Sequence, residues 1–136
     1  MPPIAYETLE RLHVGRPVER VGFIADRCRD KRVLDIGCLD ETALDKQCTN
    51  EWLHRRIGAL ATEVTGIDLS DLLPAEGLVT GPNSRIMKGD GTNPDIAPEL
   101  VDTIVAGEFI EHIENPLQFL ARMKRSYPGR EMLIST

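Results

Sequence analysis

The apolar positions near the start of the chain follow a helical period. They recur at steps of three and four residues and comprise Val18, Val21, Ile24, Ala25 and Cys28. This spacing gives one apolar stripe and predicts a helix that packs against other elements. Pro17 suits a first helical position because it lacks the N–H that a first turn leaves unpaired. We therefore predict a helical segment within residues 1–31 that packs on the rest of the chain.

Beyond this segment the period changes to short apolar runs, which are typical of buried strands. The runs cover residues 32–37, 63–68, 84–88, 100–106 and 131–135. Helical patterns lie between them, over residues 51–61, 71–78 and 116–126. Asn50 is a candidate cap for the first of these helices, and Asn115-Pro116 supplies a cap and a first-turn proline for the last.

Strands that alternate with helices predict an α/β fold with a doubly wound, mostly parallel sheet of about five strands and helices on both faces. The length of 136 residues, with 41% hydrophobic and 28% charged side chains, fits one core, which we place in residues 32–136. We expect a cytoplasmic protein without a membrane span, because no apolar run approaches about 20 residues and the first residues lack a secretory pattern.

The cysteines Cys28, Cys38 and Cys48 form no Cys-x-x-Cys pair, so neither a disulfide framework nor a zinc site is predicted. The formal net charge of −6 argues against a nucleic-acid partner. Residues 89–121 contain no Lys or Arg but seven carboxylates: Asp90, Asp95, Glu99, Asp102, Glu108, Glu111 and Glu114. Such a segment favours a cationic small molecule, or is simply a solvated acidic face.

Ligands of doubly wound sheets bind beyond the carboxyl ends of the strands, where the strand order reverses. The residues expected there are Asp35, Gly37, Cys38, Asp68, Asp90, Glu108, Glu111 and His112. A dinucleotide site also needs Gly-x-Gly-x-x-Gly before a helix, and the segment that starts at Gly37 does not provide it. A nicotinamide cofactor is therefore disfavoured.

Four segments in this order resemble the Rossmann-like class I S-adenosylmethionine-dependent methyltransferases. They are residues 33–38, 64–68, 89–90 and 108–116. The resemblance implies that Gly37 and Cys38 line the methionine end of the cofactor and that Asp68 holds the ribose hydroxyls. It also implies that Asp90 faces the adenine and that Glu108 begins the loop beside the sulfonium. Asp35 either contacts the cofactor or supports the loop.

Methyl transfer to oxygen or nitrogen needs a base, and the ordinary pKa of histidine lies near working pH. His112, with Glu111 beside it, is the candidate catalytic group. A structural role for His112 in bracing the loop stays open, as does a divalent metal held with Glu108 and Glu111. We expect no resident metal. His54 is interpreted as a surface residue or a structural hydrogen-bonding group, and Trp52 as packing.

Two features depart from the family. Leu39 occupies the place of a second glycine, which predicts either another loop path or weaker cofactor binding. The chain also stops after its fifth predicted strand, so we expect a fragment, or an edge covered by a partner or a second copy. The predicted function is S-adenosylmethionine-dependent O- or N-methylation of a small molecule, with a sugar or another biosynthetic intermediate as the candidate acceptor. The alternative is a noncatalytic module that binds a protein partner.

Overall fold

The computed structural model describes residues 15–39 and 51–136, and within them the chain forms one six-stranded sheet. The strands are β1 (Arg32–Ile36), β2 (Glu63–Asp68), β3 (Leu78–Gly81), β4 (Ser84–Lys88), β5 (Thr103–Gly107) and β6 (Glu131–Ser135). Their order is β3-β4-β2-β1-β5-β6, and every neighbouring pair is parallel except β3 with β4. The first fourteen residues, and residues 40–50 with the predicted cap Asn50 and with Cys48, lie outside the described part.

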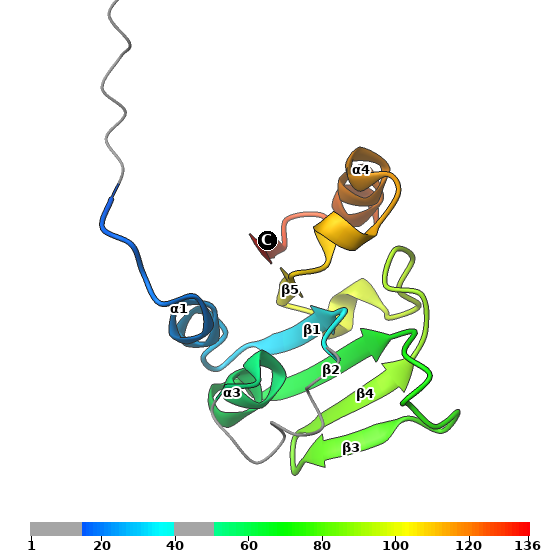
Figure 1. Ribbon diagram of the computed structural model, residues 1–136, viewed down its shortest axis with the longest axis horizontal. Helices are drawn as coiled ribbons and strands as arrows, with labels where there is room; N and C mark the ends of the chain where they lie inside the picture. The colour runs from blue at the N-terminus through cyan, green and yellow to red at the C-terminus, as the bar shows by residue number, and fades with distance from the viewer. Residues whose placement is uncertain (1–14, 40–50) are drawn as a thin grey trace, which may run out of the picture.

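Helices cover both faces of the sheet, which confirms the predicted doubly wound class. They are α1 (Arg20–Arg27), α3 (Leu53–Leu60) and α4 (Pro116–Ser126), with short 3-10 turns at Pro98–Leu100 and Ile110–His112. Helices α1 and α3 lie side by side on one face, and α4 lies on the other (Figure 1). None of the helices in the described ranges is long and apolar enough to cross a membrane.

Alternation along β1 divides the core between these two faces. Val33 packs with α1 and α3 residues such as Ile24 and Ile57, whereas Leu34 packs with Phe119 of α4. Asp35 therefore points to the α3 face, although it is a carboxylate that is only 2% exposed. That side chain belongs to the site described below.

The first residues of α1 and α4 can be compared with the helix starts that the sequence predicted. Asn115 accepts a hydrogen bond of 3.0 Å from the backbone N–H of Gln118, so the predicted start of α4 is confirmed. The start predicted at Pro17 is wrong, because α1 begins at Arg20. The carboxylate of Glu19 caps the first turn instead, accepting from the N–H groups of Val21 and Gly22.

The helix predicted over residues 71–78 is wrong. Turns occupy most of this stretch, and the antiparallel edge strand β3 begins at Leu78. Gly77 has φ +85°, and a Cβ there would lie 2.5 Å from the carbonyl oxygen of Ile86. The chain can turn into β3 here because glycine accepts that conformation and that close approach.

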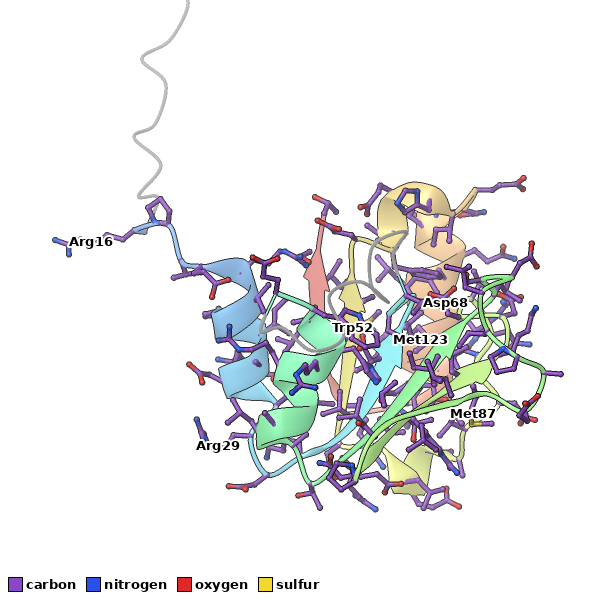
Figure 2. All side chains as sticks on the ribbon, turned by 60° about the horizontal axis from the view of Figure 1, so that its bottom comes forward. Arg16, Arg29, Trp52, Asp68, Met87 and Met123 are labelled. Carbon is purple, nitrogen blue, oxygen red and sulfur yellow. The ribbon has the colours of Figure 1, made fainter. Side chains whose placement is uncertain are left out.

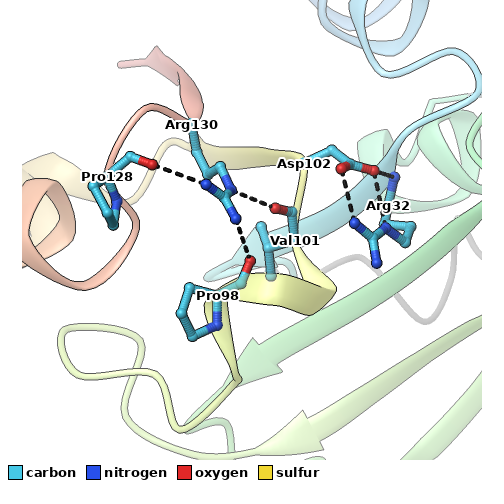
Figure 3. Close-up of polar contacts among 6 residues, drawn as sticks. All are labelled: Arg32, Pro98, Val101, Asp102, Pro128 and Arg130. Atoms are coloured by element: carbon cyan, nitrogen blue, oxygen red, sulfur yellow. Dashed lines mark hydrogen bonds and ion pairs between the residues drawn. The ribbon is translucent and has the colours of Figure 1, made fainter.

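The amino ends of β1 and β5 are joined by a bidentate ion pair (Figure 3). Asp102 accepts hydrogen bonds from the backbone N–H, Nε and Nη2 of Arg32, at 2.9, 3.0 and 3.0 Å. These bonds hold the pKa of Asp102 down, at about 2. Strand β5 starts at Thr103, three residues later than predicted, because the turn at Pro98–Leu100 takes up the earlier positions.

A second arginine closes the same edge of the sheet. The guanidinium of Arg130 donates to the carbonyl oxygens of Val101, Pro98 and Pro128 at 2.8–2.9 Å (Figure 3). Both anchors therefore lie at the amino ends of the parallel strands. The opposite edge, at the carboxyl ends, is left for the loops that build the site.

Candidate cofactor site

A cavity of about 500 Å³ opens at the carboxyl ends of β1, β2, β4 and β5. Strand β1 stands at the switch point, with β2 on one side and β5 on the other, which is where doubly wound sheets bind ligands. The predicted residues that line the cavity are Asp35, Gly37, Cys38, Asp68, Asp90, Glu108 and His112. Glu111 is the one predicted site residue that is absent from this lining within the described chain.

Asp68 ends β2 and faces the loop after β1. Its Oδ2 accepts from the backbone N–H of Leu39 at 2.9 Å, and its Oδ1 accepts from the N–H of Ser70 at 2.8 Å. Figure 2 shows Asp68 at the end of its strand and Trp52 at the start of α3. Each carboxylate oxygen has a second lone pair, so hydrogen-bonding capacity remains for ligand hydroxyls.

The described part of the loop after β1 runs from Gly37 to Leu39. Gly37 takes the positive φ of +65°, and a Cβ there would lie 2.6 Å from Phe109 Cδ2. Leu39 is only 8% exposed, and its side chain packs with Trp52, Leu73 and Ile86. The leucine is therefore a core residue whose edge reaches the cavity.

Asp90 follows β4 and is oriented by its own turn. Its Oδ1 accepts from the N–H and the Oγ1 of Thr92, at 2.9 and 2.7 Å. These two bonds lower the pKa of Asp90, so the side chain is a carboxylate at neutral pH. The next residue, Gly91, packs closely on the core, because a Cβ there would meet Ile36 and Phe109 at 2.6 and 3.1 Å.

Asp35 and His54 form a buried pair beneath the cavity. Oδ2 of Asp35 lies 2.9 Å from Nδ1 of His54, and Nε2 of His54 lies 2.8 Å from the Oγ1 of Thr80. Thr80 is in turn 2.9 Å from the Oγ of Ser84. Two interpretations of His54 were open, a surface residue and a structural hydrogen-bonding group. The structure shows the second, because the side chain is buried and hydrogen-bonded. Its position three residues before Ile57, on the apolar stripe of α3, was the available signal.

Trp52 does more than the predicted packing. Its indole Nε1–H donates to the carbonyl oxygen of Cys38 at 2.8 Å, and its ring centroid lies 5.1 Å from that of His54. Trp52 is 3% exposed. It thus fixes the loop after β1, a role that no sequence pattern indicated.

One group of metal-binding side chain types occurs in the described ranges, and it differs from the one weighed earlier. Ligand atoms of Asp35, Cys38 and His54 lie within 4.8 Å of one another. Both ring nitrogens of His54 already have hydrogen-bond partners. Burial, followed by the nearby charges of Asp35 and Asp68, raises the pKa of the Cys38 thiol well above its usual range. Asp35 and His54 are thus hydrogen-bonded to each other, and the thiol of Cys38 beside them is protonated.

The loop after β5 forms the opposite wall. Glu108 has φ +53°, a conformation that non-glycine residues rarely adopt and that is common at functional sites. Nη2 of Arg20 lies 3.7 Å from Oε1 of Glu108. The side chain of His112 is 74% exposed, and its Nε2 lies 3.9 Å from Oε1 of Glu111. The histidine therefore stands at the mouth of the cavity, on a single 3-10 turn.

The structure is thus a Rossmann-like domain with an acidic cavity at its switch point. A family model described as a methyltransferase domain matches residues 44–128, more than half of the chain. The chain belongs to the class I S-adenosylmethionine-dependent methyltransferase family, which confirms the resemblance stated from the sequence. A search of curated proteins found no match to this chain.

Proposed function

We propose that this domain binds S-adenosylmethionine in the cavity and methylates an oxygen or nitrogen atom of a small molecule. The observation that carries the proposal is the convergence of Asp68 and Asp90 on one cavity of about 500 Å³, which Gly37 at the end of the neighbouring strand β1 also lines. These residues come from three different strand ends. Their meeting is what the family resemblance predicts for the ribose, the adenine and the methionine end.

The residues present fit this cofactor. Carboxylates dominate the charged lining, and Arg20 is the only Lys or Arg among the described lining residues. That balance suits a cationic molecule without phosphate groups, since opposite charges attract over several ångströms. Gly37 and Gly91 let the cavity wall pack closely, because a Cβ on either would lie 2.6 Å from a side-chain atom of Phe109 or Ile36. S-adenosylmethionine, when bound, supplies a methyl group activated on a sulfonium sulfur.

In this proposal the protein's task is to orient the acceptor in line with the methyl carbon and to exclude water. A lone pair of the acceptor forms the new bond to carbon while the carbon–sulfur bond breaks and its electrons stay on sulfur. The proton of the acceptor passes to the imidazole of His112 at the cavity mouth, with Glu111 beside it as a carboxylate partner.

Calorimetric titration with S-adenosylmethionine and S-adenosylhomocysteine tests cofactor binding. We expect both ligands to bind, and Asp68→Ala to weaken binding at least about tenfold, because hydrogen bonds to a charged group are lost. Glu99→Ala is the matched control, since Glu99 is exposed and outside the cavity, and it should bind as the wild type does. No binding of either ligand contradicts the proposal and favours a noncatalytic module.

Once an acceptor is found, His112→Ala tests the proposed base. We expect turnover to fall by about 10²-fold or more with little change in cofactor affinity. Unchanged turnover would remove His112 from the chemistry and leave it as a group that braces the loop.

A further inference from the structure

A buried polar chain runs under the cavity from β1 to the hairpin of β3 and β4. It links Asp35, His54, Thr80 and Ser84 through three contacts of 2.8–2.9 Å. His54 is 1% exposed and Asp35 is 2% exposed, so burial of both polar groups needs these partners. Neither the family match nor the proposed chemistry gives His54 a role.

The sheet register makes room for the histidine. Asp35 of β1 stands opposite Gly66 of β2. A Cβ on Gly66 would lie 3.1 Å from Cε1 of His54 and 2.6 Å from Sγ of Cys38. The imidazole therefore lies against the backbone of Gly66. The ring of Trp52 lies nearby, with its centroid 5.1 Å from that of the imidazole. A ring packed in this way has little freedom to turn.

The two ring nitrogens have different partners, so the position of the ring proton decides which partner the ring donates to. A ring that carries its proton on Nδ1 donates to Asp35 and accepts at Nε2 from the hydroxyl of Thr80. The Oγ1 of Thr80 also lies 2.9 Å from the Oγ of Ser84. In this arrangement one oxygen of Asp35 is fixed by His54.

Asp35 lines the cavity directly before the loop of Gly37 and Cys38. The carbonyl group of Cys38 is held by Trp52, the neighbour of the His54 ring. The carboxylate and the loop are thus both oriented by residues at the start of α3. This is the part of the cavity that the proposed function assigns to the amino-acid end of the cofactor, which carries a cationic ammonium group.

We propose that His54 is a positioning residue for the amino-acid end of the cofactor, acting through its Nδ1–H bond to Asp35. The proposal rests on the proposed function. Thr80 takes part by holding Nε2, so that the Nδ1 side of the ring faces Asp35. The nucleoside end of the cofactor, next to Asp68 and Asp90, does not depend on this chain.

Two amide variants test the roles of the two ring nitrogens separately. The amide nitrogen of His54→Asn occupies about the place of Nδ1 and can donate to Asp35. The amide nitrogen of His54→Gln occupies about the place of Nε2 and reaches only Thr80. Both variants keep a polar side chain at the same helical position, so a purely structural role predicts similar behaviour. A positioning role predicts that Asn rescues binding and Gln does not.

Two ligands separate the ends of the cofactor. S-adenosylhomocysteine has an amino-acid end, whereas 5′-methylthioadenosine has the nucleoside and lacks that end. In calorimetry, we expect the affinity of His54→Asn for S-adenosylhomocysteine to lie within about threefold of wild type. The affinity of His54→Gln for the same ligand should fall about tenfold. Neither variant should change the affinity for 5′-methylthioadenosine.

An equal loss for both ligands, or no difference between the Asn and Gln variants, overturns the positioning role while leaving the proposed function intact. A wild-type protein that binds neither ligand overturns both. If His54→Gln fails to fold, Thr80→Val takes its place, because it frees Nε2 and leaves the histidine. It should weaken S-adenosylhomocysteine binding a few-fold without affecting 5′-methylthioadenosine, and an equal effect on both again overturns the proposal.

Discussion

The backbone N–H of Leu39 donates a hydrogen bond of 2.9 Å to the carboxylate of Asp68. This contact ties the loop after β1 to the end of β2, 29 residues further along the chain. It also fixes the direction of the leucine side chain, which packs with Trp52, Leu73 and Ile86. A residue that looks like an obstacle in the sequence is thereby part of the wall that supports the site.

Leu39→Ala should lower stability rather than improve cofactor binding. The side chain is 8% exposed, and removing a buried leucine side chain typically costs about 2–4 kcal/mol of unfolding free energy. Urea denaturation measures this loss. Leu100→Ala is the control, because Leu100 is 58% exposed and should change stability by less than about 0.5 kcal/mol. Tighter S-adenosylhomocysteine binding with unchanged stability would show that Leu39 obstructs the cavity.

Gly66→Ala should damage both stability and the site. The added methyl group would lie 2.6 Å from Sγ of Cys38 and 3.1 Å from Cε1 of His54, so both side chains must shift. We expect a loss of about 1–3 kcal/mol in urea denaturation and weaker binding of S-adenosylhomocysteine in calorimetry. Gly15→Ala, which meets nothing within 4 Å, should behave as wild type. Wild-type values for Gly66→Ala would mean that the surroundings of Gly66 are not closely packed.

The Arg32–Asp102 pair should make stability depend on acid pH. The pKa of Asp102 is lowered from 3.8 to about 2 in the folded protein, chiefly by hydrogen bonds from Arg32. A depressed pKa means that the stabilisation is present above about pH 4 and is lost as the pH falls toward 2. Because both side chains are more than a third exposed, we expect only about 1 kcal/mol from the pair at pH 7.

Asp102→Asn tests this in urea titrations at several pH values. The difference in unfolding free energy from wild type should be largest at neutral pH and should shrink between about pH 4 and 2. Asp26→Asn, which removes an exposed ion pair with Arg29, should cost less than about 0.5 kcal/mol. A difference for Asp102→Asn that does not change with pH would assign its effect to something other than the carboxylate charge.

Cys28 and Cys38 should resist alkylation in the folded protein. Burial, with smaller effects of nearby carboxylates, raises the pKa of Cys28 to about 12 and that of Cys38 well above its usual range. The thiolate is the reactive form, so little of it exists at pH 8. Iodoacetamide labelling followed by peptide mass analysis should leave both unlabelled until urea is added. Fast labelling of Cys38 in the native protein would contradict the protonated thiol.

The elements that the sequence predicted well are those set by periodicity and strong local signals. The strand runs at residues 63–68, 84–88 and 131–135 match the bounds of β2, β4 and β6. Strand β3 was missed since the residues before it form turns held by tertiary contacts. A β-branched pair, Val79-Thr80, followed by a Gly-Pro-Asn turn was the signal that could have revealed it.

The site was predicted in outline for a topological reason. Once strand ends are known, Asp35, Asp68 and Asp90 must lie at one edge of the sheet, and they line one cavity. Partners from other elements could not be predicted in this way. The contact of His54 with Thr80 depends on how α3 packs over β3, and the indole bond of Trp52 depends on the path of the loop after β1.

The guanidinium of Arg130 serves three carbonyl groups at the edge of the sheet remote from the cavity, and the Arg32–Asp102 pair lies at that same edge. Substitutions far apart and without shared partners have nearly additive effects on stability. Substitutions in the walls of the cavity should therefore add to the stability effects of substitutions at the remote edge without amplifying them. The register of the strands and the lining of the cavity can thus be altered independently.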